Sequence, residues 1–419
     1  MFSTDLRLLI NKTHTTQVPY SGSYLVDSAV LTKFPTDTKI LAAHPWGTSM
    51  FASTARLHIK LPDSSEKHYF LKSCPASDAG RARMESEYTS MSELYKFAPN
   101  FVPKPHSWGR YASEDPETYF FLVDFVDMKD CMPDPDQLCA KLALLHKQSK
   151  SPTGKFGFQM NTYGGAAVQT CSWESSWMVL FMRLLLNIGD LDLVRSGYWA
   201  DLDEAQNRIL THVVPRLLGA LTAGGQDIKP CLIHGDLHEG NIGTGKEDGE
   251  IYIFDSASFY AHHEMEVAHW RCFYNRVGAQ IYTRTYFKYG EMSEPKNEWD
   301  DRNRLYGLFY KLLYSVNLPE TGKAVRQTAY NDMCYLIEKY APFPEGEGPQ
   351  PIPESEIADH PARKNHAVMS PGEAVCAQGT LVNIFGEVAE DKYIEEKSVD
   401  NRDKFERYDS PFDEIEDVE

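Results

Sequence analysis

The sequence contains no long apolar run and no closely paired cysteines. No window approaches the roughly 18 apolar residues that a membrane helix needs, and the start of the chain lacks the basic and then apolar stretches of a signal peptide. The eight cysteines are scattered, without a C-x-x-C pair, which argues against a disulfide scaffold and against a zinc site. These absences predict a cytoplasmic protein with reduced thiols.

Positive charge is also scarce, since the formal net charge is -18. This argues against a nucleic-acid partner and against an anionic membrane surface. Residues Glu387 to Glu419 hold fourteen acidic and five basic residues, a net charge of -9. Before them, the Pro/Gly/Glu-rich run Pro342–Pro353 cannot sustain a helix or a sheet. We therefore predict that the ordered body ends near Tyr340, and that residues 342–419 form a Pro-rich linker and a poorly ordered acidic tail.

One segment has the residue pattern of phosphoryl transfer. In the kinase pattern H-R-D-L-x-x-x-N, the aspartate accepts the proton of the acceptor hydroxyl, the asparagine holds a metal ion, and a later aspartate holds another. In this chain these places fall on Asp236, Asn241 and Asp255. Carboxylate and amide oxygens suit Mg²⁺, a hard cation. The spacing therefore predicts an ATP- and Mg²⁺-dependent kinase of a small molecule.

Two other patterns in this region are weaker. Gly240–Glu247 has the G-x-x-x-x-G-K spacing of a P-loop, but Glu247 stands where a hydroxyl must bind Mg²⁺. A second group resembles a zinc cluster, yet its H-E-x-x-x-x-H spacing does not bring two imidazoles onto one helical face: His262, His263, Glu264 and His269. We expect a solvated hairpin tip at the first and a helix-surface or capping role at the second.

The upstream sequence predicts the small lobe of a kinase. Residues 55–61 and 68–73 alternate between apolar and polar side chains, with a polar turn between them, which predicts a hairpin. Lys72, on the second strand, is the candidate for the lysine that contacts the α and β phosphates. Residues 79–97 carry a helical apolar stripe, and a glutamate beside it would hold that lysine. We prefer Glu87 for this role, with Glu85 as the alternative.

Two more segments complete the predicted nucleotide site. His44–Phe51 is the candidate phosphate-covering loop, although it has a single glycine, Gly47. Thr118–Val126 reads as an apolar strand that ends where an adenine-holding hinge belongs. The hinge candidates are Asp124, Phe125 and Val126.

These elements predict an α+β, bilobal, protein-kinase-like fold. Residues 21–126 form the N-terminal lobe, with a small antiparallel sheet that binds the nucleotide. Residues 127–341 form a mainly helical lobe that carries catalysis and the substrate. We expect ATP to bind between the lobes, and the protein to be a monomer or a weak dimer.

Beyond these general features, the chain resembles the fructosamine-kinase family, a branch of the aminoglycoside-phosphotransferase and choline-kinase-like fold, from about Ser21 to Tyr340. Phe254–Glu266 is similar to the family's D-P-A-S-F-Y-G-H-x-E-x-E segment. Three further blocks agree: Lys155–Phe158, Gly164-Gly165, and Trp173-x-x-x-Trp177 leading to Phe181 and Arg183.

The resemblance implies phosphorylation at the 3-hydroxyl of a ketosamine, the adduct of a sugar with a lysine or a free amine. The phosphorylated adduct then breaks down, which is protein deglycation. It also implies that Asp236 is the proton acceptor, Asn241 and Asp255 the metal ligands, and Lys72 and Glu87 the pair that positions ATP.

The chain departs from the family at the expected acceptor pocket. The family has a tryptophan two residues after the catalytic aspartate, where this chain has His238; Ser256 replaces a proline. His238, Trp173 and Trp177 are candidate substrate contacts, although tryptophans at helical spacing are more often core residues. The alternatives are a kinase of another alcohol, such as an aminoglycoside, choline or a sugar, and a catalytically weak nucleotide-binding protein.

Two glutamates of the family segment have open roles. Glu264 and Glu266 either orient the loop after Asp255 or face solvent, and Arg183 is a possible partner of one of them.

Overall fold

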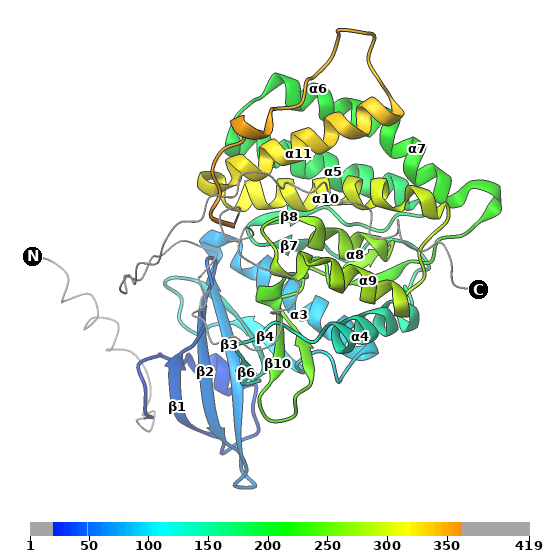
Figure 1. Ribbon diagram of the computed structural model, residues 1–419. Helices are drawn as coiled ribbons and strands as arrows, with labels where there is room; N and C mark the ends of the chain where they lie inside the picture. The colour runs from blue at the N-terminus through cyan, green and yellow to red at the C-terminus, as the bar shows by residue number, and fades with distance from the viewer. Residues whose placement is uncertain (1–19, 48, 363–419) are drawn as a thin grey trace, which may run out of the picture. The chain divides into compact units, whose positions relative to one another are not determined.

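The computed structural model describes residues 20–47 and 49–362, and its chain divides into two compact units. Of the described residues, the first unit contains 20–47, 49–84 and His106–Phe125. The second unit contains Glu85–Pro105 and residues 126–362. Figure 1 shows an antiparallel sheet in the first and a mainly helical architecture in the second.

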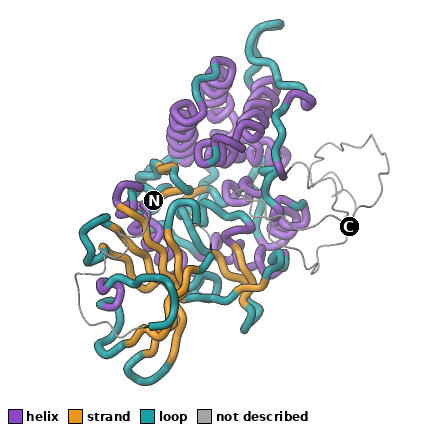
Figure 2. Tube along the Cα trace, turned by 90° about the vertical axis from the view of Figure 1, so that its left-hand side faces the viewer, coloured by secondary structure: helices purple, strands orange, loops and turns teal. Residues whose placement is uncertain are grey.

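The first unit is built on a five-stranded sheet with the order β1-β2-β3-β5-β4, drawn as orange strands in Figure 2. The pairs β1–β2, β2–β3 and β3–β5 are antiparallel. The strands are β1 (Lys39–Pro45), β2 (Ser53–Lys60), β3 (Glu66–Pro75), β4 (Pro105–Arg110) and β5 (Thr118–Asp124). The predicted hairpin is therefore β2–β3, with register Thr54 opposite Lys72.

Alternation of side chains divides this sheet into two faces. Ala55, Leu57 and Ile59 of β2 are fully buried in a core that includes Val30 of the short helix α2 (Ser28–Leu31). The polar residues between them point to the opposite face, and so does Lys72 of β3, because it pairs with Thr54. One face of the sheet therefore forms the core and the other presents polar groups.

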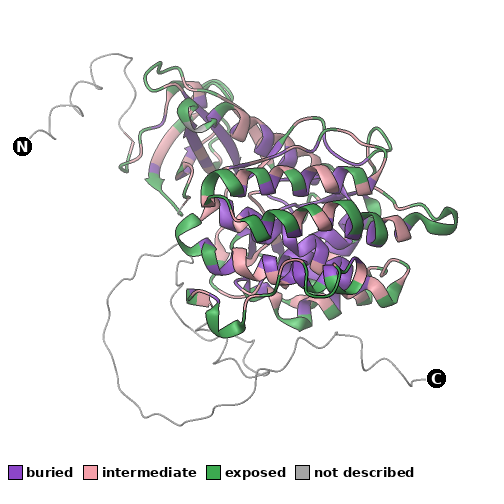
Figure 3. Ribbon diagram, turned by 90° about the horizontal axis from the view of Figure 1, so that it is seen from above, coloured by how far each residue is buried: buried purple, intermediate pink, exposed green. Residues whose placement is uncertain are grey.

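Long helices form the core of the second unit. Helix α10 packs against α5, α8 and α11, and its buried residues include Leu305, Leu308 and Leu312. Figure 3 shows that the helices turn their buried residues inward and their exposed residues outward. The long helices are α3 (Gly80–Phe97), whose start belongs to the first unit, α4 (Pro135–Gln148), α5 (Trp177–Ser196), α9 (Gln280–Tyr289), α10 (Trp299–Asn317) and α11 (Pro319–Tyr340). The shorter ones are α6 (Ala200–Arg208), α7 (Val214–Gly219) and α8 (Glu264–Ala268).

Three small sheets accompany the helices. One has the order β11-β10-β6, a second pairs β12 with β9, and a third pairs β7 with β8. The strands are β6 (Met128–Lys129), β7 (Thr162–Gly164), β8 (Ala167–Gln169), β9 (Cys231–Ile233), β10 (Ile242–Gly245), β11 (Ile251–Ile253) and β12 (Phe259–Ala261). The chain therefore enters the kinase-like segment on β9, and the second loop of that segment lies between β11 and β12.

The sequence predicted that the ordered body ends near Tyr340, but the described structure continues to Ala362. The Pro-rich segment continues along α11, where the Tyr330 hydroxyl donates to the carbonyl of Gln350 at 2.8 Å. Asn331 donates to the carbonyl of Ile352 and accepts from its N–H, both at 2.8 Å. Side chains of α11 thus hydrogen-bond to the backbone of a segment whose prolines keep it out of a helix or a sheet. The acidic tail lies outside the described residues.

None of the helices described in residues 20–362 is long and apolar enough to cross a membrane.

Candidate functional site

The loop after β9 requires a glycine at its first bend. Gly235 has φ +80°, a conformation that L side chains rarely adopt. A Cβ at this position would lie 2.4 Å from the carbonyl oxygen of Ala257. The close approach of these two loops therefore excludes any side chain at residue 235.

Buried side chains hold the backbone of this loop. The carboxylate of Glu266 is fully buried and accepts the N–H of Gly235 at 3.1 Å and the N–H of His234. The indole of Trp270 donates to the carbonyl of Leu237 at 3.0 Å. Glu266 thus orients the loop that contains Asp236, whereas the sequence pointed to the loop after Asp255 or to solvent.

His234 connects the two loops that carry the predicted catalytic and metal residues. Its Nε2 donates to the carbonyl of Phe254 at 2.8 Å, and its Nδ1 accepts the N–H of Asp236 at 3.3 Å. One nitrogen donates while the other accepts, so the imidazole is neutral. Burial lowers the pKa of His234, which favours this neutral form. The His234 ring thereby links the backbone of Phe254, just before Asp255, to the backbone of Asp236 through hydrogen bonds.

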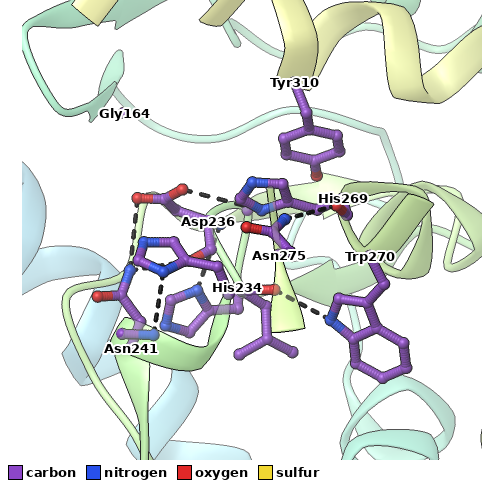
Figure 4. Close-up of polar contacts among 12 residues, drawn as sticks. Gly164, His234, Asp236, Asn241, His269, Trp270, Asn275 and Tyr310 are labelled. Atoms are coloured by element: carbon purple, nitrogen blue, oxygen red, sulfur yellow. Dashed lines mark hydrogen bonds and ion pairs between the residues drawn. The ribbon is translucent and has the colours of Figure 1, made fainter. Parts of the chain in front are cut away.

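Asp236 lies beside Asn241, as the spacing predicted (Figure 4). The amide of Asn241 donates to the carbonyl oxygen of Asp236 at 2.9 Å and to its carboxylate Oδ2 at 3.4 Å. The Asp236 side chain is 22% exposed. Burial raises its pKa above the ordinary value, and the histidines beside it act in the opposite direction. The carboxylate is therefore held in place and still accessible to an acceptor.

The donor set suits a magnesium ion. Because the Asn241 amide nitrogen faces Asp236, its carbonyl oxygen is the atom left for a ligand. Asp255 follows β11 with φ +57°, an uncommon conformation for a residue with a side chain, and its side chain is half-buried. A carboxamide oxygen and a carboxylate are hard donors, which is the chemistry Mg²⁺ requires.

His238, which stands in place of the family tryptophan, has a fixed position. Its Nδ1 accepts the N–H of Gly240 at 3.0 Å, and its ring lies edge-on to His269 with the centroids 5.8 Å apart. The ring is half-buried. His238 therefore belongs to the immediate surroundings of Asp236.

The two candidate tryptophans differ. Trp177 is 2% exposed, and its indole donates to the hydroxyl of Tyr306 at 2.8 Å, so it is a core residue. This corrects its interpretation as a substrate contact. Trp173 is half-buried, and its ring centroid lies 6.0 Å from that of Tyr260. Only Trp173 of the pair has the exposure that a substrate contact needs.

The histidine-rich segment is structural. Both ring nitrogens of His262 are hydrogen-bonded. Nδ1 lies 2.9 Å from the hydroxyl of Tyr306, and Nε2 lies 2.8 Å from the hydroxyl of Ser293. Glu264 pairs with Arg302 at 3.0 Å, and both side chains are fully buried. His262, His263 and Glu264 lie close enough together to share a metal ion, but both nitrogens of His262 and the carboxylate of Glu264 already have protein partners. The burial of His262 and Glu264 corrects the expectation of a helix-surface role. Arg183 pairs with Glu174 at 2.9 Å and not with a glutamate of this segment.

The first unit contains most of the predicted nucleotide-binding residues. Lys72 lies on β3 between Thr54 of β2 and Phe121 of β5, and is half-buried. Gly47 lies in the β1–β2 loop with φ +71°, in open space. Asp124 ends β5, and its carboxylate lies 2.6 Å from His106. Val126 and Glu87 belong to the second unit, where Glu87 is a buried residue of α3.

A cluster of side chains at the end of β5 left no signal in the sequence. Phe125 packs edge-on to Trp46 of the β1–β2 loop, with centroids 5.4 Å apart. The guanidinium of Arg56 lies 4.5 Å from the Phe125 ring centroid and 5.4 Å from that of Trp46. These residues are far apart in sequence, so only the sheet register brings them together.

Comparison with curated proteins finds relatives of modest identity. A rice protein (Oryza sativa subsp. indica) named protein-ribulosamine 3-kinase, chloroplastic, is 29% identical over 245 residues, 58% of this chain and 66% of the rice protein. The Arabidopsis thaliana protein of the same name is 28% identical over 58% of this chain and 69% of its own length. Mouse (Mus musculus) ketosamine-3-kinase is 26% identical over 49% of this chain and 70% of the mouse protein. The chain thus spans about two thirds of the length of these relatives.

Solved structures share the fold. A Thermobifida fusca protein provisionally named a fructosamine-3-kinase superposes with a TM-score of 0.57 at 21% identity, covering 75% of this chain and all of that one. A Haemophilus somnus protein with the same provisional name superposes with a TM-score of 0.54 at 17% identity. The match covers 71% of this chain and 92% of the Haemophilus protein. The family model described as fructosamine kinase matches residues 31–333. The chain therefore belongs to the fructosamine kinase family.

Proposed function

We propose that this chain is an ATP-dependent kinase that phosphorylates the 3-hydroxyl of ketosamines, ribulosamine or fructosamine adducts, and so initiates protein deglycation. Family membership and the names of the plant and mouse relatives support the reaction class and the substrate class. The observation that carries the proposal is the placement of Asp236, whose loop is fixed by Glu266 and whose carboxylate lies beside Asn241.

Asp236 acts as the proton acceptor. The acceptor hydroxyl donates its hydrogen bond to the carboxylate, and its oxygen attacks the γ-phosphorus of ATP. A bond forms between that oxygen and phosphorus, the bond from phosphorus to the departing ADP oxygen breaks, and the hydroxyl proton passes to Asp236. The raised pKa of Asp236 favours this proton transfer.

Asn241 and Asp255 would hold Mg²⁺, which neutralises charge on the phosphate oxygens. For the nucleotide, we propose that Lys72 contacts the phosphates and is held by Glu87, and that Gly47 allows the loop backbone to approach them. The hinge residues Asp124, Phe125 and Val126 are proposed to contact adenine. Each of these assignments rests on motif position and on the element that carries the residue.

The acceptor pocket differs from that of the family because His238 replaces a tryptophan. Its position near Asp236 makes it a proposed substrate contact, together with the half-buried Trp173. An imidazole is smaller than an indole and can hydrogen-bond to a sugar hydroxyl. A kinase of another small alcohol is therefore the second candidate function.

The test is a Mg·ATP consumption assay of the full chain with ribulose-lysine, fructose-lysine, choline and an aminoglycoside. Asp236→Asn is assayed in parallel, with ATP affinity measured by calorimetry. We expect ketosamine turnover that the variant loses by at least about a thousandfold while it still binds ATP. Turnover of choline or the aminoglycoside alone would replace the ketosamine assignment, and full activity of Asp236→Asn would refute the role of Asp236.

We also propose a monomer or weak dimer that acts in the cytoplasm. None of the seven cysteines in the described part of the chain forms a disulfide, which suits a reducing compartment. Sedimentation of the purified chain tests the first statement, and imaging of the tagged full-length chain in its own cells tests the second.

A further inference from the structure

His269 is held rigidly next to the catalytic loop. It begins the 3-10 turn His269–Arg271 that follows α8, and its ring stacks flat on Tyr310 of α10, with centroids 4.3 Å apart and an interplanar angle of 6°. Its carbonyl accepts the amide of Asn275 at 2.7 Å. Figure 4 shows the His269 ring between Tyr310 and Asp236. Both the backbone and the ring of His269 therefore have defined positions.

The Nδ1 atom of His269 faces Asp236 across a short gap. It lies 3.9 Å from Oδ1 of the carboxylate, which is too far for a direct hydrogen bond. An ion pair is also unfavourable, because burial lowers the pKa of His269 well below its ordinary value and keeps the ring neutral. The two atoms are thus close without bonding to each other.

This nitrogen has no hydrogen-bond partner among the described residues, a property that it shares with Nε2 of the buried His146 but not with the ring nitrogens of His234 and His262. The His269 side chain is 5% exposed. Buried polar atoms in native proteins are nearly always paired, so an unpaired one beside a catalytic carboxylate calls for a ligand atom.

We propose that His269 is a second contact of the acceptor hydroxyl, whose oxygen lies between Nδ1 of His269 and Oδ1 of Asp236. This inference rests on the proposed kinase function. An oxygen about 2.8 Å from each atom spans the gap with an angle of roughly 90° at the oxygen. The hydroxyl donates to the Asp236 carboxylate and accepts from the Nδ1–H of the neutral ring.

Two contacts constrain the acceptor oxygen more than one does. With its proton directed at Asp236 and one lone pair at His269, a remaining lone pair of the hydroxyl has a defined direction for attack on phosphorus. His269 thereby selects an oxygen that can approach both groups. Because Tyr310 supports the ring from behind, the contact is already positioned before the acceptor binds.

Two substitutions separate this role from packing. His269→Phe keeps a flat ring against Tyr310 but removes Nδ1, whereas His269→Asn places an amide group near the position of Nδ1. We expect His269→Phe to lower kcat/KM for the acceptor by about tenfold or more, with KM for ATP changed less than about twofold. We expect His269→Asn to recover most of that loss, although it fills the site less well.

His263→Phe is the matched control, because His263 lies in the same segment and its Nε2 is bonded to the carbonyl of Glu291 at 2.8 Å. It should change thermal stability without changing the acceptor kinetics. Equal acceptor kcat/KM in His269→Phe and wild type, or no recovery in His269→Asn, would overturn the proposal.

A second measurement does not depend on the identity of the acceptor. A high-resolution crystal structure of the wild-type protein without acceptor should show an ordered water within hydrogen-bond distance of both Nδ1 and Oδ1, and His269→Phe should lose it. The lack of such a water in the wild type, or a protein atom bonded to Nδ1, would refute the inference. If no ketosamine is phosphorylated, the proposed function fails, while this crystallographic comparison still decides the role of His269.

Discussion

The fully buried carboxylate of Glu266 accepts the backbone N–H of Gly235 at 3.1 Å, thirty-one residues earlier in the chain. The same carboxylate accepts the N–H of His234, so a single side chain fixes the entry to the loop that carries Asp236. The position of the proposed base therefore depends on a fully buried residue from a later part of the chain.

Replacing Glu266 by Gln should impair both folding and turnover. Glutamine offers one acceptor oxygen where two N–H groups need partners, and its NH₂ would face a backbone donor. We expect the free energy of unfolding to fall by about 1–3 kcal/mol, and kcat to fall about tenfold or more with little change in KM for ATP. Urea unfolding and steady-state kinetics measure these effects, and a variant with unchanged stability would show that the carboxylate is dispensable.

Gly235→Ala should be far more damaging than alanine at another left-handed glycine. At residue 235 the new Cβ would lie 2.4 Å from the Ala257 carbonyl oxygen. Gly249, on the β10–β11 hairpin, has φ +72° but nothing within 4 Å of its Cβ position. Gly249→Ala should therefore cost only the conformational term of about 1–2 kcal/mol, measured by denaturant unfolding. Equal losses in the two variants would contradict the close approach of the loops.

Lys72→Ala tests the nucleotide assignment. Loss of the ammonium should lower kcat/KM for ATP by about a hundredfold, since Lys72 is proposed to contact the phosphates. Lys67→Ala is the matched control, because Lys67 lies on the same strand but is exposed. Steady-state kinetics with varied ATP distinguish the two, and a similar small effect in both would remove Lys72 from the site.

Stability should fall as the pH drops below about 6.5, the ordinary pKa of histidine. Burial lowers the pKa of His262 well below that value, so protons bind the unfolded chain more readily than the folded one. Its contribution is fully present above pH 6.5 and is lost as the pH falls towards the folded pKa. Urea unfolding at several pH values measures the slope. His262→Gln should reduce that slope by up to about 1.4 kcal/mol per pH unit, and an unchanged slope would exclude His262 as its source.

The two tryptophans should give opposite results. Trp177→Ala should lower the free energy of unfolding by about 3–5 kcal/mol, because it removes a buried ring together with the hydrogen bond that the indole donates to the Tyr306 hydroxyl. Trp173→Ala should change stability less and raise KM for the acceptor. Thermal melts and acceptor kinetics compare them, and a large stability loss at Trp173 with unchanged KM would make it a core residue as well.

Sequence reasoning succeeded where chemistry requires residue types at a fixed local spacing. The short loop from Asp236 to Asn241 brings the two side chains together, so the spacing alone predicts their proximity. The β2–β3 hairpin followed from alternation, because one face of the sheet is buried. Both features arise within a short stretch of chain.

The supporting contacts could not be predicted, because they depend on tertiary packing. Nothing local distinguishes Glu266, which holds the loop that contains Asp236, from Glu264, which pairs with Arg302. Trp173 and Trp177 are four residues apart, yet the second starts α5 facing the core and the first precedes the helix. The orphan nitrogen of His269 is likewise visible only when the fold brings it to Asp236.

The hydrogen bonds between α11 and the Pro-rich segment set a practical limit on how far the protein can be trimmed. A crystallisation fragment cut at residue 341 would lose the backbone partners of Tyr330 and Asn331 and leave these side chains facing solvent. His360 also packs against Phe273, with ring centroids 5.1 Å apart. A stable fragment should therefore extend to Ala362, and tags or fusion partners at the C-terminus belong after that residue.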